Sequence, residues 1–440
     1  MSAADQTDEQ MLDEVQRETF NYFIREFNPA NGMVADGNQP GQPASIAAIG
    51  LALTAYPIGV ERGFITRAEA IRRILATLEF FQNSPQGEAP DATGYKGFYY
   101  HFLDMNTGRR AWKSELSTID SALLLAGMLA AAQYFDADNY DETRLCELAD
   151  ALYRRVDWQW AQNGELTVSH GWKPESGFLP WRWEGYCEAL ILYVLGLGSP
   201  TCPLPKEAYR AWLSSYAWKS AYGLEMVYGG PLFMHQLSHI WIDFRGIYDA
   251  FMRDKKIDYF ENSRRATLLQ QRYAIDNPLR FPGYGAQGWG ITACNGPGPR
   301  MLKIDGIERQ FFGYIARGAP FGPDDGTLAP WAVVASLPFA PEIVLPTMRF
   351  YIDEMELKER SGEGFKATFN PLFPNPENKK AGWSSPWKYG VNQGPIVMMI
   401  ENYRSGYVWE LMRGCSYLIE GLRRADFRGG WLKASGNKEN

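Results

Sequence analysis

The sequence predicts an all-α protein, an (α/α)6 barrel in which six helical hairpins close into an inner and an outer ring. Three observations predict this fold. Apolar residues recur with the period of an α-helix in twelve segments of the chain. Several of these segments are apolar nearly all round, as inner helices with neighbours on both sides must be. The alternation of strands with helices that a parallel sheet requires is missing.

The predicted helices follow one another without a linker or a low-complexity stretch, which predicts a single domain over residues 1–440. Segments 44–57, 116–135 and 185–197 have the composition of inner helices, whereas 66–83 carries the charged stripe of an outer helix. "TRAE" at Thr66 and "STID" at Ser117 resemble capping boxes and indicate two helix starts. The predicted helices are 8–27, 44–57, 66–83, 116–135, 142–158, 185–197, 206–220, 233–250, 258–275, 327–337, 341–355 and 394–424, the last broken at Ser405-Gly406.

The loops between the helices contain the few strand signals. "GFYYHFLDMNTGRRAW" (97–112) predicts a β-hairpin that turns at 106–108 and places His101 on a hairpin rather than on a helix. In an (α/α)6 barrel the loops at one rim gather into a cleft, and the aromatic, polar stretches that precede the inner helices line it. We therefore expect short β-hairpins in the rim loops around a binding cleft.

Composition and charge narrow the class of ligand. The net charge is -7 and Lys and Arg form no stripe, so nucleic acid is not expected as a partner, because phosphate binding rests on clustered cations. Aromatic residues make up 14% of the chain, including 15 Trp and 24 Tyr. A neutral ligand fits this balance better than a polyanion.

The N-terminus and the cysteines indicate the compartment. No apolar run approaches the ~20 residues that a spanning helix needs, so no membrane insertion is expected. "MSAADQTDEQMLDEV" has no apolar core of a signal peptide, which predicts a soluble, cytoplasmic protein as the sequence stands, or a periplasmic one if a signal peptide was removed from a longer precursor. The five cysteines are scattered and form no CxxC, so we expect reduced thiols. The sequence does not indicate an oligomeric state.

Two glutamates open the apolar segment "LPWRWEGYCEALILYVLGLG" (179–198). Glu184 and Glu188 are four residues apart, which places them on one face of a predicted helix with aromatic side chains around them. Desolvation and a like charge raise the pKa of a carboxyl group, as a general acid near neutral pH requires. The alternative is that both acids only interact with the helix dipole, which stabilises an ionised acid at Glu184 more than at Glu188, one turn deeper.

Further carboxylates precede other inner helices. Glu115 and Asp120 flank the start of 116–135, where Asp120 also fits a capping role. Asp324 and Asp325 precede 327–337, where Asp325 also fits a cap. The sequence alone does not rank these residues as a catalytic base.

Three other motifs suggest different chemistry. In "HQLSHIWID", His235, His239 and Asp243 recur every four residues and would share one helix face, as metal ligands can; the alternative is hydrogen bonding, with Asp243 paired to Arg245. "GYGAQG" (283–288) matches GxGxxG but lacks the βαβ context of a dinucleotide site. "SPWK" (385–388) matches SxxK with an internal proline in a loop, which argues against a nucleophilic serine.

Seven long motifs together identify a family. "SIAAIGLALTAYPIGVERG", "GFYYHFLDMNTGRRAWKSELSTIDSALLLAG", "WRWEGYCEALILYVLGLGSP", "GPLFMHQLSHIWIDFRG", "DYFENSRRATL", "DGTLAPWAVVASLPFAPE" and "NQGPIVMMIENYRSGYVWELM" occur in order from about residue 10 to 425. The chain resembles the bacterial glycoamylase-like family that includes the endo-β-1,2-glucanases and sophorooligosaccharide hydrolases. The resemblance implies an (α/α)6 barrel and an inverting glycoside hydrolase whose partner is an oligo- or polysaccharide of β-1,2-linked glucose. Hydrolysis by two carboxyl groups implies neither cofactor nor metal.

The resemblance also implies roles for single residues. Glu188 matches the glutamate of the family's "WxGYxE" motif and is the candidate acid, while Glu115 and Asp120 match the acidic positions of "SExSTID". Side chains in cleft motifs resemble sugar contacts: His101, Arg182, Trp183, Tyr186, His235, Gln236, His239, Arg245 and Trp289.

One position departs from the family's pattern. Where members of the family read GF, any residue, then DAFN, this chain reads "GFKATFN" (364–370), so Ala367 replaces a carboxylate that is a candidate base. The departure leaves a catalytically silent or transglycosylating glucan-binding barrel as the alternative to a hydrolase.

Overall fold

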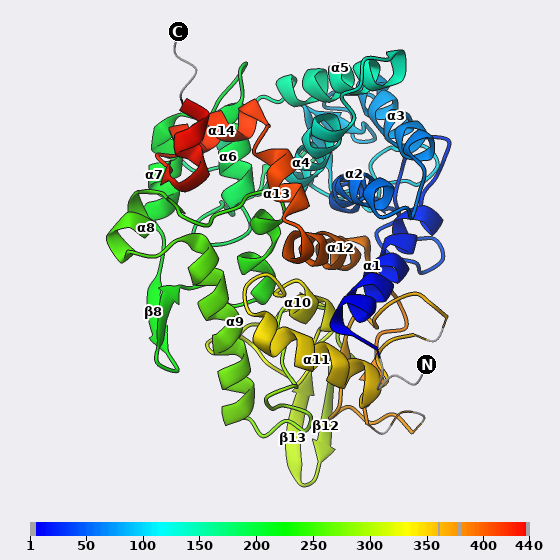
Figure 1. Cartoon of the computed structure of the whole chain (residues 1–440), viewed down its shortest axis with the longest axis vertical. Coiled ribbons are helices and arrows are strands. Elements are labelled where there is room, and N and C mark those ends of the chain that lie inside the picture. The colour runs from blue at the N-terminus through cyan, green and yellow to red at the C-terminus, as the bar shows by residue number, and fades with distance from the viewer. Residues whose placement is uncertain (1–5, 360, 377, 379, 437–440) are drawn as a thin grey trace.

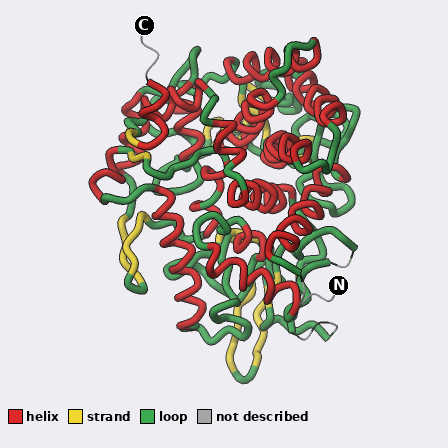
Figure 2. The backbone as a smooth tube through the Cα atoms, viewed as in Figure 1, coloured by secondary structure: helices red, strands yellow, loops and turns green. Residues whose placement is uncertain are grey.

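The structure, a computed structural model, describes residues 6–359, 361–376, 378 and 380–436. Helices make up most of the body and the strands are short (Figures 1 and 2). The helices are α1 (Asp8–Arg25), α2 (Ile46–Glu61), α3 (Arg67–Asn83), α4 (Thr118–Tyr134), α5 (Tyr140–Arg154), α6 (Leu190–Gly198), α7 (Lys206–Ser214), α8 (Ala250–Lys255), α9 (Tyr259–Asp276), α10 (Pro330–Val334), α11 (Pro341–Asp353), α12 (Gly390–Arg404), α13 (Tyr407–Met412) and α14 (Ser416–Arg424), with 3-10 helices η2 (Trp160–Gln162), η3 (Leu232–His235), η4 (Leu237–Ile240) and η5 (Gly430–Gly436).

The strands lie in the loops between the helices. They are β1 (Ala44–Ser45), β2 (Gly94–Tyr95), β3 (Phe98–Tyr100), β4 (Phe102–Leu103), β5 (Leu116–Ser117), β6 (Gly171–Lys173), β7 (Gly177–Phe178), β8 (Trp218–Ala221), β9 (Leu224–Val227), β10 (Ile247–Tyr248), β11 (Ala293–Cys294), β12 (Arg300–Ile304), β13 (Ile307–Phe311), β14 (Ile315–Ala316), β15 (Phe369–Asn370), β16 (Trp383–Ser384) and β17 (Arg428–Gly429). The long hairpin β12–β13 extends from the helical body at the bottom of Figure 1.

The predicted (α/α)6 barrel is confirmed. Its inner positions are α2, α4, α6, the η3–η4 segment, α10 and α12, and α12 packs back against α2 to close the ring. The outer positions are α1, α3, α5, α7, α9 and α11. All nine residues of α6 are buried, whereas α3 buries one face only, as the predicted inner and outer patterns require.

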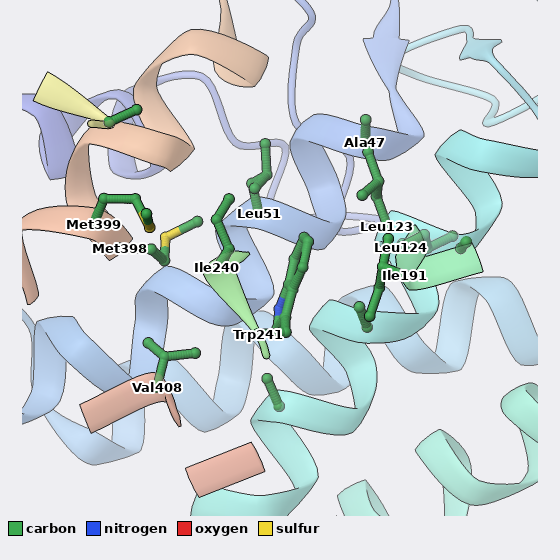
Figure 3. Packing of buried hydrophobic residues seen from close by; sticks show 14 of the residues in the cluster. Ala47, Leu51, Leu123, Leu124, Ile191, Ile240, Trp241, Met398, Met399 and Val408 are labelled. Carbon is green, nitrogen blue, oxygen red and sulfur yellow. The ribbon is translucent and has the colours of Figure 1, made fainter. Parts of the chain in front are cut away.

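The inner ring has a continuous apolar core. Trp241, which follows η4, lies among Leu51 of α2, Leu124 of α4 and Met398 of α12 (Figure 3). The Trp241 indole donates a hydrogen bond to Thr54 Oγ1 at 3.0 Å, so its polar atom has a partner although the ring is buried. The core therefore runs through the centre of the barrel and the binding surface is left to the rim loops.

Two glycines set the distance between α2 and α4. A Cβ on Gly50 would lie 2.3 Å from the Leu123 carbonyl oxygen, and a Cβ on Gly127 would lie 2.0 Å from the Gly50 carbonyl oxygen. Both distances are far below van der Waals contact. The two helices approach this closely because neither residue carries a side chain.

The predicted helix at 233–250 is wrong. Residues 232–240 form the two short 3-10 helices, β10 follows at Ile247, and α8 begins only at Ala250. Helical backbone ends here because the Asp243 carboxylate accepts the backbone N–H of Arg245 at 3.1 Å and Gly246 has φ 72°. His235, His239 and Asp243 therefore do not lie on one face of a helix.

Two other helix boundaries differ from the prediction by five residues or more. The helix expected at 185–197 begins at Leu190, because Gly185 has φ 74° and the chain turns before it becomes helical. The helix expected at 206–220 ends at Ser214, and β8 follows, joined to β9 by Tyr222-Gly223 with φ 53° and 73°. Two residues with positive φ are typical of a tight hairpin turn, so a strand replaces the last helical turn.

The rim strands exceed the predicted hairpins. Strands β2, β3, β5, β6 and β7 form a five-stranded sheet in the order β2-β3-β5-β6-β7. The turn expected at 106–108 is present, since Asp104 accepts the backbone N–H groups of Asn106 and Thr107, and Leu103 pairs with Arg110 across it. His101 lies between β3 and β4, outside any helix, as predicted.

Further predictions concern caps, thiols and membrane insertion. Thr66 accepts the backbone N–H of Glu69, and Ser117 accepts that of Asp120, so both predicted helix starts are confirmed. All five cysteines are free. In the described part of the chain, no helix is long and apolar enough to cross a membrane. The assignment of residues 1–440 to one domain stays a prediction.

Candidate active site

An acidic cluster lies where the loops before α2, α4 and α6 meet. The His101 ring joins two of its members: Nδ1 is 2.9 Å from Glu115 Oε1, and Nε2 is 3.6 Å from Asp120 Oδ2. Glu115 directly precedes β5, and Asp120 lies in the first turn of α4. The Ser117 hydroxyl donates to Asp120 Oδ2 at 2.5 Å, which fixes this carboxylate next to the histidine.

The charge of His101 follows from its surroundings. Burial alone would lower the pKa of His101, but the carboxylates of Asp120, Glu115 and Asp36 raise it to about 9. Burial would likewise raise the pKa of Glu115, and the hydrogen bond and charge of His101 lower it below its usual value. At neutral pH the site therefore holds a protonated imidazole between the side chains of Glu115 and Asp120.

Glu188 has the properties of a proton donor. Burial raises its pKa to about 7; a backbone hydrogen bond opposes this shift, and the negative charge of Asp120 adds to it. Its Oε2 atom is buried and has no hydrogen-bond partner in the protein. A buried carboxyl oxygen without a partner costs least when it carries a proton, so Glu188 is neutral for an appreciable part of the time at neutral pH.

The structure adds Asp36 and Tyr314 to the cluster. Burial raises the pKa of Asp36 to about 6, opposed by the charge of His101 and assisted by that of Asp120. Desolvation raises the pKa of Tyr314 to about 12, and Glu188 is among the negative groups that add to the shift, although 71% of this tyrosine is exposed. The sequence reasoning missed both residues. Asp36 precedes an inner helix, so the rule that found Glu115 could have found it.

Comparison with known proteins places the chain in a family. The Glycoamylase family model, described as "Putative glucoamylase", matches residues 180–416, which is more than half of the chain. The chain belongs to the Glycoamylase family. The resemblance seen in the sequence motifs is confirmed.

Solved structures of family members cover the whole barrel. A "putative glucoamylase" from Bacteroides uniformis is 31% identical, with 97% of this chain and 99% of that chain covered and a TM-score of 0.84. An endo-β-1,2-glucanase from Chitinophaga pinensis, solved with sophorotriose and glucose, is 28% identical, with 97% of this chain and all (100%) of that chain covered and a TM-score of 0.83.

A curated relative is longer than this chain. The exo-β-1,2-glucooligosaccharide sophorohydrolase (non-reducing end) of Parabacteroides distasonis is 27% identical over an alignment of 462 positions that covers 95% of this chain. The chain spans 58% of the length of that relative.

The loop before α6 does not place all its family-motif residues in the cluster. Glu184 is exposed and accepts a hydrogen bond from Thr167 Oγ1 at 3.1 Å, and it does not share a helix face with Glu188 as the spacing predicted. Arg182 donates to the backbone oxygens of Gln162 and Thr167, so its guanidinium holds the loop together. Trp183 donates to Thr118 Oγ1 at 2.9 Å and stacks on His170.

Several expected sugar contacts are buried in the structure. His235 is held by the Gly229 carbonyl oxygen, Gln236 donates to the Ala332 carbonyl oxygen, and His239 pairs with Ser263. Burial lowers the pKa of His235 to about 4, so this imidazole is neutral. The side chains that pack inside the barrel and contact protein rather than cleft are Tyr186, His235, Gln236, His239 and Trp289.

The two histidines and Asp243 do not form the predicted helix face. Asp243 pairs with Arg245 at 2.7 Å and with Arg413 at 2.5 Å, and the Arg245 guanidinium lies 4.5 Å from the centre of the Trp409 ring. Among residues 6–359, 361–376, 378 and 380–436, no group of three or more His, Cys, Asp or Glu side chains is arranged to hold a metal ion. The geometry supports the hydrogen-bonding interpretation of this motif.

The remaining acidic candidates have structural partners. Asp325 forms a bidentate pair with Arg317, and Asp324 accepts hydrogen bonds from Tyr273 and Tyr284. Ala367, where the family pattern has a carboxylate, is 2% exposed and lies two residues before Phe369, which pairs with Leu328.

Proposed function

We propose that this chain is an inverting glycoside hydrolase that cleaves β-1,2-glucosidic bonds in glucans or sophorooligosaccharides. The observation that carries the proposal is Glu188, a carboxyl group whose pKa burial and the charge of Asp120 raise to about 7, while Asp120 and Glu115 flank the His101 ring. Inverting hydrolysis needs one protonated carboxyl group and one carboxylate at ~6.5–9.5 Å, on opposite sides of the bond. The β-1,2 linkage of the proposed substrate is taken from the names of the Chitinophaga and Parabacteroides relatives.

The two carboxyl groups have different roles in this proposal. Glu188 donates its proton to the leaving glycosidic oxygen, which burial of the carboxyl group prepares it to do. Asp120 accepts a proton from the water that attacks the anomeric carbon, and His101 and Ser117 hold its carboxylate in place. Glu115 is engaged by His101, so it positions and charges the imidazole.

The function is tested by incubating the protein with β-1,2-glucan and measuring new reducing ends, with starch and β-1,3-glucan as parallel substrates. We expect reducing ends from the β-1,2-linked substrate only. NMR of the fresh products should show the α-anomer first, because inversion at a β-bond produces it. Reducing ends from starch alone, or the β-anomer first, would contradict the proposal.

A glucan-binding or transglycosylating barrel is the second candidate, and Ala367 is the observation that favours it. A chain that does not activate water can bind the glucan without cleaving it, or pass the glycosyl group to a sugar hydroxyl whose proton a carboxylate of the cluster accepts, without net hydrolysis. Binding of β-1,2-glucan with no new reducing ends would support this candidate. Longer oligosaccharides formed from sophorotriose would identify the transfer activity.

Chelation tests the role that the sequence motif at His235 suggested for a metal. We expect turnover on β-1,2-glucan to persist after prolonged dialysis against EDTA, because proton transfer between two carboxyl groups and the substrate needs no Lewis acid. Turnover that is lost on chelation and restored by zinc or manganese would contradict this expectation.

A further inference from the structure

Trp112 stands in an unusual backbone conformation beside the acidic cluster. Its φ is 54° and that of the next residue, Lys113, is 49°. The two residues are the centre of a turn that the Ser114 N–H closes by donating to the Ala111 carbonyl oxygen at 3.0 Å, and a side chain as bulky as Trp is strained at such a position. The indole is nevertheless 61% exposed, so core packing does not explain the conformation.

A series of rings connects this indole to the cluster. The Trp112 ring lies 5.0 Å from the Phe102 ring at an interplanar angle of 56°. Phe102 in turn stacks on His101, with centroids 4.0 Å apart and planes 12° from parallel. His101 contacts both Glu115 and Asp120. Two ring contacts therefore separate the exposed indole from the carboxylates.

Arg110 holds the loop of Trp112 in this shape. Its side chain is 2% exposed and its guanidinium lies 4.7 Å from the centre of the Tyr100 ring. It donates to the Ser114 carbonyl oxygen at 2.6 Å and to that of Lys113 at 2.9 Å. Glu175 pairs with the same guanidinium at 2.6 Å. The strained turn is thus fastened at its C-terminal side to β3 and to the β6–β7 turn.

We propose that Trp112, in contact with Phe102, is a stacking platform for one glucosyl unit of the substrate on the side of His101 where these rings lie. The inference rests on the proposed function and adds a subsite to it. Sugar rings present apolar C–H faces that pack on indole, and a ring that is exposed and fixed before binding loses little freedom when the ligand arrives. A glucan chain that is cleaved at Glu188 and extends past His101 would reach this platform.

The test measures affinity and stability together. In the full chain carrying Glu188→Gln, Trp112→Gly should weaken binding of a β-1,2-linked oligosaccharide about tenfold, measured by calorimetry. The loss should appear with long oligomers and vanish with sophorose, the disaccharide. The unfolding midpoint should stay the same or rise, because glycine tolerates positive φ. Trp112→Phe, which keeps a ring, should retain most of the affinity.

Tyr140→Ala is the matched control, since Tyr140 is 82% exposed on the outer helix α5, and its loss should leave affinity unchanged. Equal affinity of Trp112→Gly and its parent at every chain length would overturn the platform while leaving the hydrolase intact. Parallel loss of affinity and of the unfolding midpoint at all lengths would show a structural role and overturn it as well. A wild-type chain that neither binds nor cleaves β-1,2-glucan would overturn the proposed function, and the platform with it.

Discussion

Glu188→Gln should lower turnover on β-1,2-glucan by ~10²–10⁴-fold, the range typical of losing a general acid. Glutamine keeps the volume of the side chain but has no proton to transfer to the leaving oxygen. Folding should stay intact, because the substitution replaces a carboxyl group whose buried Oε2 already lacks a partner by a neutral amide. Turnover on glucan and the unfolding midpoint are the two measurements.

The pH profile gives a second readout of the same group. An acid must be protonated to act, so wild-type kcat should be high below the Glu188 pKa of about 7 and fall as the pH rises through it. Glu188→Gln should lose this alkaline limb. Wild-type turnover in a natively folded Glu188→Gln protein would contradict the assignment and direct attention to Glu115 and Glu184.

Leaving-group dependence separates the acid from the base. A substrate with a leaving oxygen of low pKa scarcely needs protonation, so Glu188→Gln should be impaired far less on an activated aryl glycoside than on glucan. Asp120→Asn is the matched variant. Since it removes the group assigned to water activation, it should slow both substrates by similar factors.

The surroundings that raise the pKa of Glu188 could be predicted only in part from the sequence. Apolar surroundings and a like charge were expected, and burial with the charge of Asp120 does raise the pKa. The expected like charge was Glu184, on the assumption of a helix at 185–197. The positive φ of Gly185 delays the helix to Leu190, so the neighbouring acid comes instead from a different rim loop. Contacts between rim loops form only when the ring of inner helices closes, so the spacing of residues within one loop does not predict them.

The fold was more predictable than the site for a related reason. Buried inner helices such as α2 and α4 have an apolar periodicity that each segment carries by itself. The segment predicted as a helix at 233–250 also has apolar and aromatic residues, but they are buried for a different reason. Trp241 bonds to Thr54, which is far away in the sequence, and the chain turns at Gly246 with φ 72°. Trp112 was missed because it lies in a turn, where residue type alone does not distinguish a structural from a functional role.

Arg317→Met should be the most destabilising substitution near the cleft, by about 3–5 kcal/mol, because it leaves a buried carboxylate without its partner. Arg317 and Asp325 are both fully buried side chains, joined by two hydrogen bonds of 2.8 Å. Arg317 also donates to the carbonyl oxygens of Phe312 and Gly313, immediately before Tyr314. We therefore expect a lower midpoint in guanidinium unfolding and reduced turnover where the protein is still folded, since the Tyr314 loop loses its anchor.

Arg264→Met is the control: its pair with Glu342 is exposed, and its loss should cost about 0–1 kcal/mol. Equal midpoints for the two variants would show that the buried pair contributes no more than an exposed one.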